Sequence, residues 1–207
     1  MSEHYTKTSF AFVADGDDAL FLSAVLDVVT ALRDDAAESP AIVDLFADHG
    51  ARFASVFPVR AVSGQLDDCL SGLVSLFDDE AHPSLGLDHV RFGQWQEPSI
   101  LVSISGDQVE CDTLAEIIRR CCPQTLREGP VGFEVCFDCS RPHEDAFGGA
   151  SYVIFSDRVV SCGTYRLIDL ILACPRRFES WPPKPGLFRR WLRQVSASIR
   201  TAILAAR

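Results

Sequence analysis

Apolar residues recur at steps of four along residues 18–34, at Leu20, Ala24, Val28 and Leu32. Side chains four residues apart lie on one face of a helix, so this spacing predicts an amphipathic helix over residues 18–34. Asp17 comes at the start of this stretch and is the expected N-cap. The preceding residues 8–14 (TSFAFVA) are rich in β-forming residues and predict a strand. The chain therefore opens with a strand, a turn and a helix.

A second unit of the same kind follows 90 residues later. Residues 99–107 (SILVSISGD) align with residues 9–17 (SFAFVADGD), and an apolar helix follows and ends at Pro123. Thr113 and Glu116 have the spacing of a capping box at the start of this helix. Duplication of one unit, as in a split β-α-β sheet, and chance similarity of two β-rich segments both account for the match.

The pattern between and after these two units predicts further short elements. Between them we expect a short helix over 42–46, a strand over 52–60, a helix over 65–77 and a long loop or irregular edge over 82–96. After them we expect strands over 131–137, 151–155 and 158–172, with Asp157 in a hairpin turn. Three consecutive strands favour an α+β fold: a mixed or antiparallel sheet with two main helices on one face.

The C-terminal part differs from the rest of the chain in amino-acid composition. Residues 174–186 hold four prolines in thirteen positions, which is typical of a linker. Residues 187–207 then predict an amphipathic helix with an apolar side and a basic side, and its candidate contact residues are Arg189, Arg190, Trp191 and Arg193. We therefore expect one α+β domain over 1–173, a linker over 174–186 and a terminal helix. That helix either packs on the domain or contacts a partner. An anionic membrane and nucleic acid are the less favoured partners.

Charge is divided unevenly along the chain. Residues 1–157 hold 27 acidic and nine basic residues, a formal charge of −18, whereas residues 158–207 hold two acidic and ten basic residues, a charge of +8. The two parts should prefer opposite kinds of surface. The mean hydropathy of +0.11 is that of a globular protein. No export signal is recognisable, so we expect a cytoplasmic protein whose eight cysteines are free thiols.

One stretch combines cysteine, histidine and charged residues. Cys136 and Cys139 form a Cys-x2-Cys pair with His143 nearby, but a structural zinc site needs a second pair, so we expect no metal and no cofactor. Arg141 and Asp145 either form an ion pair that fixes the loop, or the loop presents Arg141 and His143 to a ligand. The candidate binding residues here are Cys139, Arg141, His143 and Asp145.

The same stretch resembles a known pattern. Residues 133–134, 139–142 and 145–149 read FE, CSRP and DAFGG. They are similar to the FEW…CSRPRxDEFGGG motif of small uncharacterised bacterial proteins, some of them carried on mobile elements. The resemblance covers roughly residues 112–160 and departs from the pattern at Val135, His143 and Ala146. It implies a compact unit and no particular activity.

Residues 87–90 (LDHV) suggest a different reading. They resemble the opening strand of glyoxalase-type, vicinal-oxygen-chelate enzymes, in which such a histidine binds a divalent metal. By that resemblance His89 would be a metal ligand, with Glu134 as the acidic ligand. The Asp-Pro-x-Gly-Asn stretch of that family has no counterpart in this sequence.

These patterns leave three hypotheses for function. The favoured one is a non-enzymatic, acidic binding or accessory protein of a bacterium or mobile element, whose partner is another protein or a second copy of itself. The first alternative is a small metal-dependent enzyme of glyoxalase-like type. The second is an acidic inhibitor that mimics nucleic acid through carboxylate clusters such as Asp78-Asp79-Glu80.

Overall fold

The computed structural model of the protein describes residues 4–33, 39–58, 66–139 and 148–164. Several of the expected features lie outside these residues. They are the linker 174–186, the helix 187–207 with Arg189, Arg190, Trp191 and Arg193, and the loop residues Arg141, His143 and Asp145.

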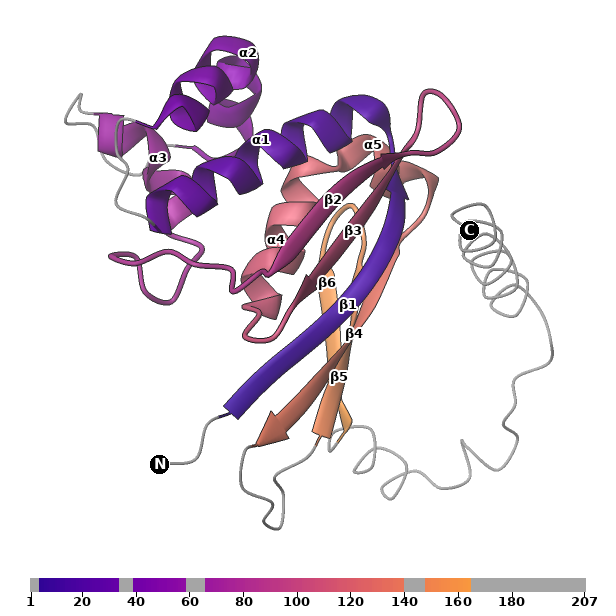
Figure 1. The fold of residues 1–207 in the computed structure, drawn as a ribbon. Helices are drawn as coiled ribbons and strands as arrows, with labels where there is room; N and C mark the ends of the chain where they lie inside the picture. The colour runs from indigo at the N-terminus through magenta and orange to yellow at the C-terminus, as the bar shows by residue number, and fades with distance from the viewer. Residues whose placement is uncertain (1–3, 34–38, 59–65, 140–147, 165–207) are drawn as a thin grey trace. The chain divides into compact units, whose positions relative to one another are not determined.

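A six-stranded antiparallel sheet forms the base of the fold (Figure 1). Its strands are β1 (His4–Ala14), β2 (His89–Gln94), β3 (Ile100–Gly106), β4 (Val131–Cys139), β5 (Gly148–Ile154) and β6 (Val159–Gly163). They lie in the order β2-β3-β1-β4-β5-β6, and each adjacent pair is antiparallel. The expected α+β class is confirmed, and the described sheet is antiparallel rather than mixed.

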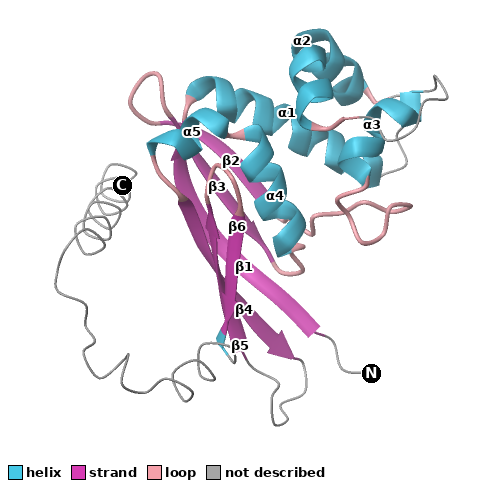
Figure 2. Ribbon diagram, turned by 180° about the vertical axis from the view of Figure 1, so that it is seen from behind, coloured by secondary structure: helices cyan, strands magenta, loops and turns pink. Residues whose placement is uncertain are grey.

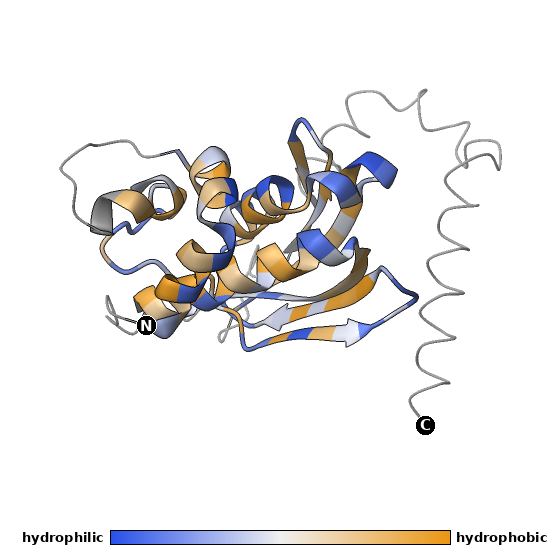
Figure 3. Cartoon of the chain, turned by 90° about the horizontal axis from the view of Figure 1, so that it is seen from above, coloured by the Kyte–Doolittle hydropathy of each residue, from blue (hydrophilic) through white to orange (hydrophobic). Residues whose placement is uncertain are grey.

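Five helices are described: α1 (Gly16–Arg33), α2 (Pro40–Val56), α3 (Leu66–Val74), α4 (Cys111–Cys121) and α5 (Pro123–Glu128). Helix α1 packs on β3, α4 packs on β5 and β6, and α2 packs against α1 as an outer layer (Figures 2 and 3). Apart from the additional helices α2, α3 and α5, the order β1-α1-β2-β3-α4-β4 is that of a split β-α-β sheet, with β5 and β6 added at one side. None of the described helices is both long and apolar enough to span a membrane.

Strand β1 shows which side of the sheet the helices cover. Phe12 and Ala14 are buried beneath the helices, whereas Ser9, Ala11 and Val13 alternate with them and are exposed. An aromatic row lies on the covered side, where the Phe133 ring stacks on Phe10 at 4.6 Å and on Tyr152 at 4.8 Å between centroids. The opposite side, here called the open face, carries Ser9, Ala11 and their cross-strand neighbours.

The expected strand over 52–60 is wrong, because helix α2 continues to Val56. Its buried residues Ile42, Leu45 and Phe53 recur at helical spacing, and Ser39 caps its first turn. The β-branched and aromatic residues near its end suggested a strand, but packing against α1 overrides that local preference. The stretch 82–96, expected as a long loop or an irregular edge, contains the edge strand β2.

The helix starts differ from those expected. Asp15, not Asp17, caps α1: its carboxylate accepts hydrogen bonds from the N–H groups of Asp17 at 3.0 Å and Asp18 at 3.4 Å. The capping box of α4 does not form, because α4 begins at Cys111 and Thr113 lies within its first turn, where its hydroxyl donates to the Leu76 carbonyl oxygen at 2.9 Å. Glu116 instead binds the guanidinium groups of Arg119 and Arg120 one turn along the helix.

The two strand–turn–helix units occupy equivalent places, β1-α1 and β3-α4. The residue-by-residue match does not hold, however, because Gly16 begins a helix whereas Gly106 ends a strand. The structure therefore supports the expected split arrangement and leaves duplication a prediction.

One buried polar network joins four of the helices. Asp18 on α1 is fully buried and accepts hydrogen bonds from the backbone N–H and hydroxyl of Thr125, at 2.8 and 3.0 Å. The Arg52 guanidinium on α2 donates to Asp18 at 2.7 Å and to the Cys121 carbonyl oxygen at 2.8 Å. It also lies 4.3 Å from the centre of the Phe21 ring. This network ties α1, α2, α4 and α5 together above the sheet.

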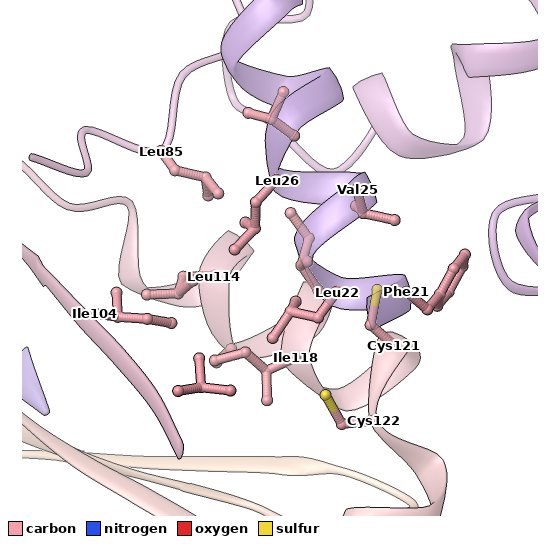
Figure 4. Close-up of a cluster of buried hydrophobic side chains, with 14 of the residues drawn as sticks. Phe21, Leu22, Val25, Leu26, Leu85, Ile104, Leu114, Ile118, Cys121 and Cys122 are labelled. Carbon is pink, nitrogen blue, oxygen red and sulfur yellow. The ribbon is translucent and has the colours of Figure 1, made fainter. Parts of the chain in front are cut away.

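The cysteines at the end of α4 belong to the apolar core (Figure 4). Cys121 and Cys122 lie among Leu22, Ile118 and neighbouring apolar side chains, and all six cysteines whose side chains the structure describes are free. Burial raises the pKa of both Cys121 and Cys122, and it raises the pKa of the Cys111 thiol to about 11. The expectation that thiols serve as small core groups is confirmed for these three residues.

This burial predicts a selective pattern of alkylation. At about pH 8 an alkylating reagent attacks thiolates, so the exposed Cys136 should react in the folded protein while Cys121 and Cys122 stay unmodified. Peptide mass spectrometry after brief treatment with N-ethylmaleimide, in buffer and in denaturant, measures this. Equal labelling of Cys121 and Cys136 in buffer would contradict the burial described here.

Candidate binding groove on the open face of the sheet

A row of polar side chains crosses the open face from strand to strand. The cross-strand pairs are His89 with Ser105, Ser105 with Ser9, and Glu134 with Ser151. Thr8 pairs with Val135, so Ser9 lies opposite Glu134 one step further along that register. Because side chains alternate between the faces of a strand, these residues share one side of the sheet.

The row forms part of an open groove of about 800 Å³. We call this the polar groove, and its lining comes from four strands and the residues that flank them: Lys7, Thr8, Ser9, Asp88, His89, Ser105, Gly106, Asp107, Glu134, Val135 and Cys136. Its floor is made of backbone and small side chains, because Ser9 and Ser105 occupy the two central strands. Asp88 and Glu134 lie at its two sides, on the β2 and β4 ends of this row of strands.

Lys7 is the one described lysine, and it already has an acidic partner. Its ammonium donates to the Asp138 carboxylate at 3.1 Å and lies 5.1 Å from the centre of the Tyr5 ring. The hydrogen bond to Asp138 raises the pKa of Lys7, and the nearby Asp107 charge acts in the same direction. Lys7 therefore remains cationic, with its charge directed toward Asp138.

The groove has an excess of negative charge. Asp88, Asp107 and Glu134 supply three carboxylates against the single ammonium of Lys7. Within the part of the chain that the structure describes, the side chains of Asp88 and Glu134 have no hydrogen-bond or ion-pair partner. Both are exposed. The arrangement can accept hydrogen bonds from a cation, and it repels a phosphate.

The structure places His89 and Glu134 in the same groove but on opposite sides of it. His89 begins β2, Glu134 lies on β4, and β3 and β1 run between them. Three strand spacings of roughly 4.8 Å separate the two backbones by about 14 Å. Among the described residues no three His, Cys, Asp or Glu side chains form a group suited to a metal ion. The metal site thus stays a prediction. The structure places His89 and Glu134 in the same groove, but on strands that are not adjacent.

Of the candidate residues in the Cys-x2-Cys stretch, the structure describes only a part. Cys139 ends β4, where its backbone pairs with that of His4, and its side chain lies outside the described residues. Its motif neighbour Cys136 lines the polar groove.

Sequence reasoning missed Lys7, Ser9, Asp88, Ser105 and Asp107 as members of one site. The sequence of β1 did contain a signal for the uncovered side of the sheet. Ser9 and Ala11 alternate with Phe10 and Phe12, which is the pattern of a strand with one uncovered side. The register that brings four strands together could not be read from that alternation.

No protein-family model, curated protein or solved structure matches this chain. The interpretation of the groove therefore rests on its own geometry and charge.

Proposed function

We propose that the protein is a non-enzymatic binding protein that holds a cationic segment of a partner protein in the polar groove. The observation that carries this proposal is the pair of exposed carboxylates without a partner in the described structure, Asp88 and Glu134, on opposite sides of the groove. A lysine or arginine side chain from a partner would supply the missing counter-charge.

The scaffold supports binding with little rearrangement. The groove floor lies on β1 and β3, the two middle strands of the four that line it, and the other face of these strands is buried beneath the helices. Groups held on a packed sheet are already in position, so less conformational entropy is lost when a ligand binds. The acidic charge of residues 1–157 would also attract a cationic partner from a distance.

Removing one groove carboxylate should weaken binding without unfolding the protein. For Glu134→Gln and for Asp88→Asn we expect the affinity for a fluorescein-labelled peptide of arginine, glycine and serine to fall about two- to fivefold each, because each variant loses one exposed charge contact. Fluorescence anisotropy measures the affinity, which should also fall steeply as salt is added.

Two matched controls remove the same charge elsewhere. Asp44→Asn lies on the outer helix α2 and Glu128→Gln lies at the end of α5, and both are exposed. Both should bind the peptide as the unaltered protein does. Equal losses in the controls and the groove variants would show that only the overall charge attracts the peptide, and the proposal would fail.

The acidic nucleic-acid mimic is a special case in which the partner's cationic surface normally binds a phosphate backbone. Competition separates it from the general proposal. If a double-stranded DNA displaces the partner that the groove binds, the two ligands share one site on that partner.

A further inference from the structure

A second hollow lies on the covered side of the sheet, between α1 and the edge strand β2. We call it the edge cleft, and it has a volume of about 520 Å³. Its lining consists of Ser23, Leu26, Asp27, Val29, Thr30, Ser84, Leu85, Gly86, Leu87, Asp88, His89, Val90 and Phe92. Such a volume suits one or two bulky side chains or a small molecule.

The walls of the cleft are largely apolar. Val90 and Phe92 pair with the buried residues Ile104 and Val102, so they face the helices, but they remain only partly buried at the sheet edge. Leu87 is likewise half-buried. These three side chains leave apolar surface in contact with water that a partner's apolar side chain could cover. Asp27 stands on the α1 side, where desolvation raises its pKa.

The edge cleft and the polar groove meet at the same two residues. Asp88 and His89 line both hollows, one from each side of the sheet edge. The loop that carries them is tightly held: the Asp88 N–H donates to the Ser105 carbonyl oxygen at 3.0 Å, and the Glu110 N–H donates to the Leu85 carbonyl oxygen at 3.2 Å. A ligand can therefore pass around a fixed edge from one hollow into the other.

We infer that the segment bound by the polar groove also carries a bulky apolar side chain, and that the edge cleft receives it. The inference rests on the proposed function, because it names the partner's chemistry at that site: a basic residue for Asp88 and Glu134, and a leucine, methionine or phenylalanine for the cleft. An extended chain advances about 3.3 Å per residue, so the two side chains should lie roughly two to four residues apart.

The test compares two short fluorescein-labelled peptides of equal charge. One contains arginines in a glycine–serine background, and the other has a leucine–phenylalanine pair placed two, three or four residues after an arginine. On the unaltered protein we expect the best-spaced apolar peptide to bind about tenfold more tightly, since it covers roughly one apolar side chain.

Two variants of the edge cleft test whether the tighter binding of the apolar peptide arises there. Leu87→Gln makes the wall polar, and Thr30→Tyr fills the cleft from an exposed position on α1. Both should abolish the gain of the apolar peptide and leave binding of the simple arginine peptide unchanged. Circular dichroism confirms that each variant is folded. Because one variant removes apolar surface and the other occupies space, a shared folding defect would not explain a shared loss.

The possible results separate the inference from the proposed function. If the arginine peptide binds in a Glu134-dependent way but the apolar pair adds nothing, the inference is overturned and the proposed function stands. The inference is also overturned if the gain survives in both cleft variants. If neither peptide binds, or if Glu134→Gln has no effect on either, the proposed function itself fails.

Discussion

Replacing Arg52 with methionine is expected to lower the free energy of unfolding by about 2–4 kcal/mol. The variant keeps an unbranched apolar stem but removes the guanidinium that donates to Asp18 at 2.7 Å. Asp18 is fully buried, so its carboxylate would keep only the two hydrogen bonds from Thr125 as compensation for lost hydration. The estimate lies below that for a wholly enclosed pair because the Arg52 side chain is 29% exposed.

Urea unfolding followed by circular dichroism measures this loss. Arg127→Met is the matched control, because Arg127 is an exposed arginine on α5 that binds only the nearby Gln124 side chain in the described structure. It should change stability by less than about 0.5 kcal/mol. The double variant Asp18→Asn with Arg52→Met should regain part of the loss, since a neutral amide is easier to bury. A loss below about 1 kcal/mol for Arg52→Met would show that the network does not hold the helices together.

The Gly86→Ala variant should be destabilised by roughly 2–5 kcal/mol, the combined cost of a left-handed alanine and of overpacking. Gly86 has a φ of 62°, a conformation that favours glycine. An added Cβ would overlap the carbonyl oxygen of Gln108. This oxygen belongs to the backbone, so it cannot move aside as the end of a flexible side chain could. The loop must therefore shift, and it carries the Asp88 and His89 residues that line both hollows.

Thermal unfolding and peptide binding should both respond to Gly86→Ala. Gly129→Ala is the control: its backbone is extended and nothing lies within 4 Å of an added Cβ, so we expect little change in either measurement. If Gly86→Ala were as stable as the unaltered protein and bound the arginine peptide normally, the loop would not be held as tightly as its backbone hydrogen bonds indicate.

Local pattern was informative wherever an element buries one regular face. The helix after residue 15 and the strands over 131–137 and 151–155 were expected within a few residues of their observed bounds, whereas the strand expected over 158–172 is observed as β6, which ends at Gly163. Their apolar residues recur with a single period, and that period is sufficient to identify the element. Helix α2 was expected only over 42–46, because Phe53 and Val56 look like part of a strand, and their packing against α1 keeps that stretch helical.

The candidate site was foreseen only as separate residues. His89 and Glu134 were singled out as a metal pair, and Cys136 as part of a zinc motif. The structure instead places all three in one wide groove with Ser9 and Ser105 between them. The residue types were therefore a useful signal for the groove, but their arrangement in space could not be read from the sequence, because residues 45 positions apart in the chain can lie on strands separated by two others.

The sequence by itself determined the class of the fold, the acidic balance of residues 1–157 and the alternation along β1 that separates Phe10 and Phe12 from Ser9 and Ala11. These properties follow from composition and from the short-range geometry of helices and strands. Only the tertiary structure decided the strand order, the register that aligns His89 with Ser105 and Glu134 with Ser151, and the meeting of both hollows at Asp88. Strand order and register depend on contacts between residues far apart in the chain, and a shift of one residue would move every groove side chain to the covered face.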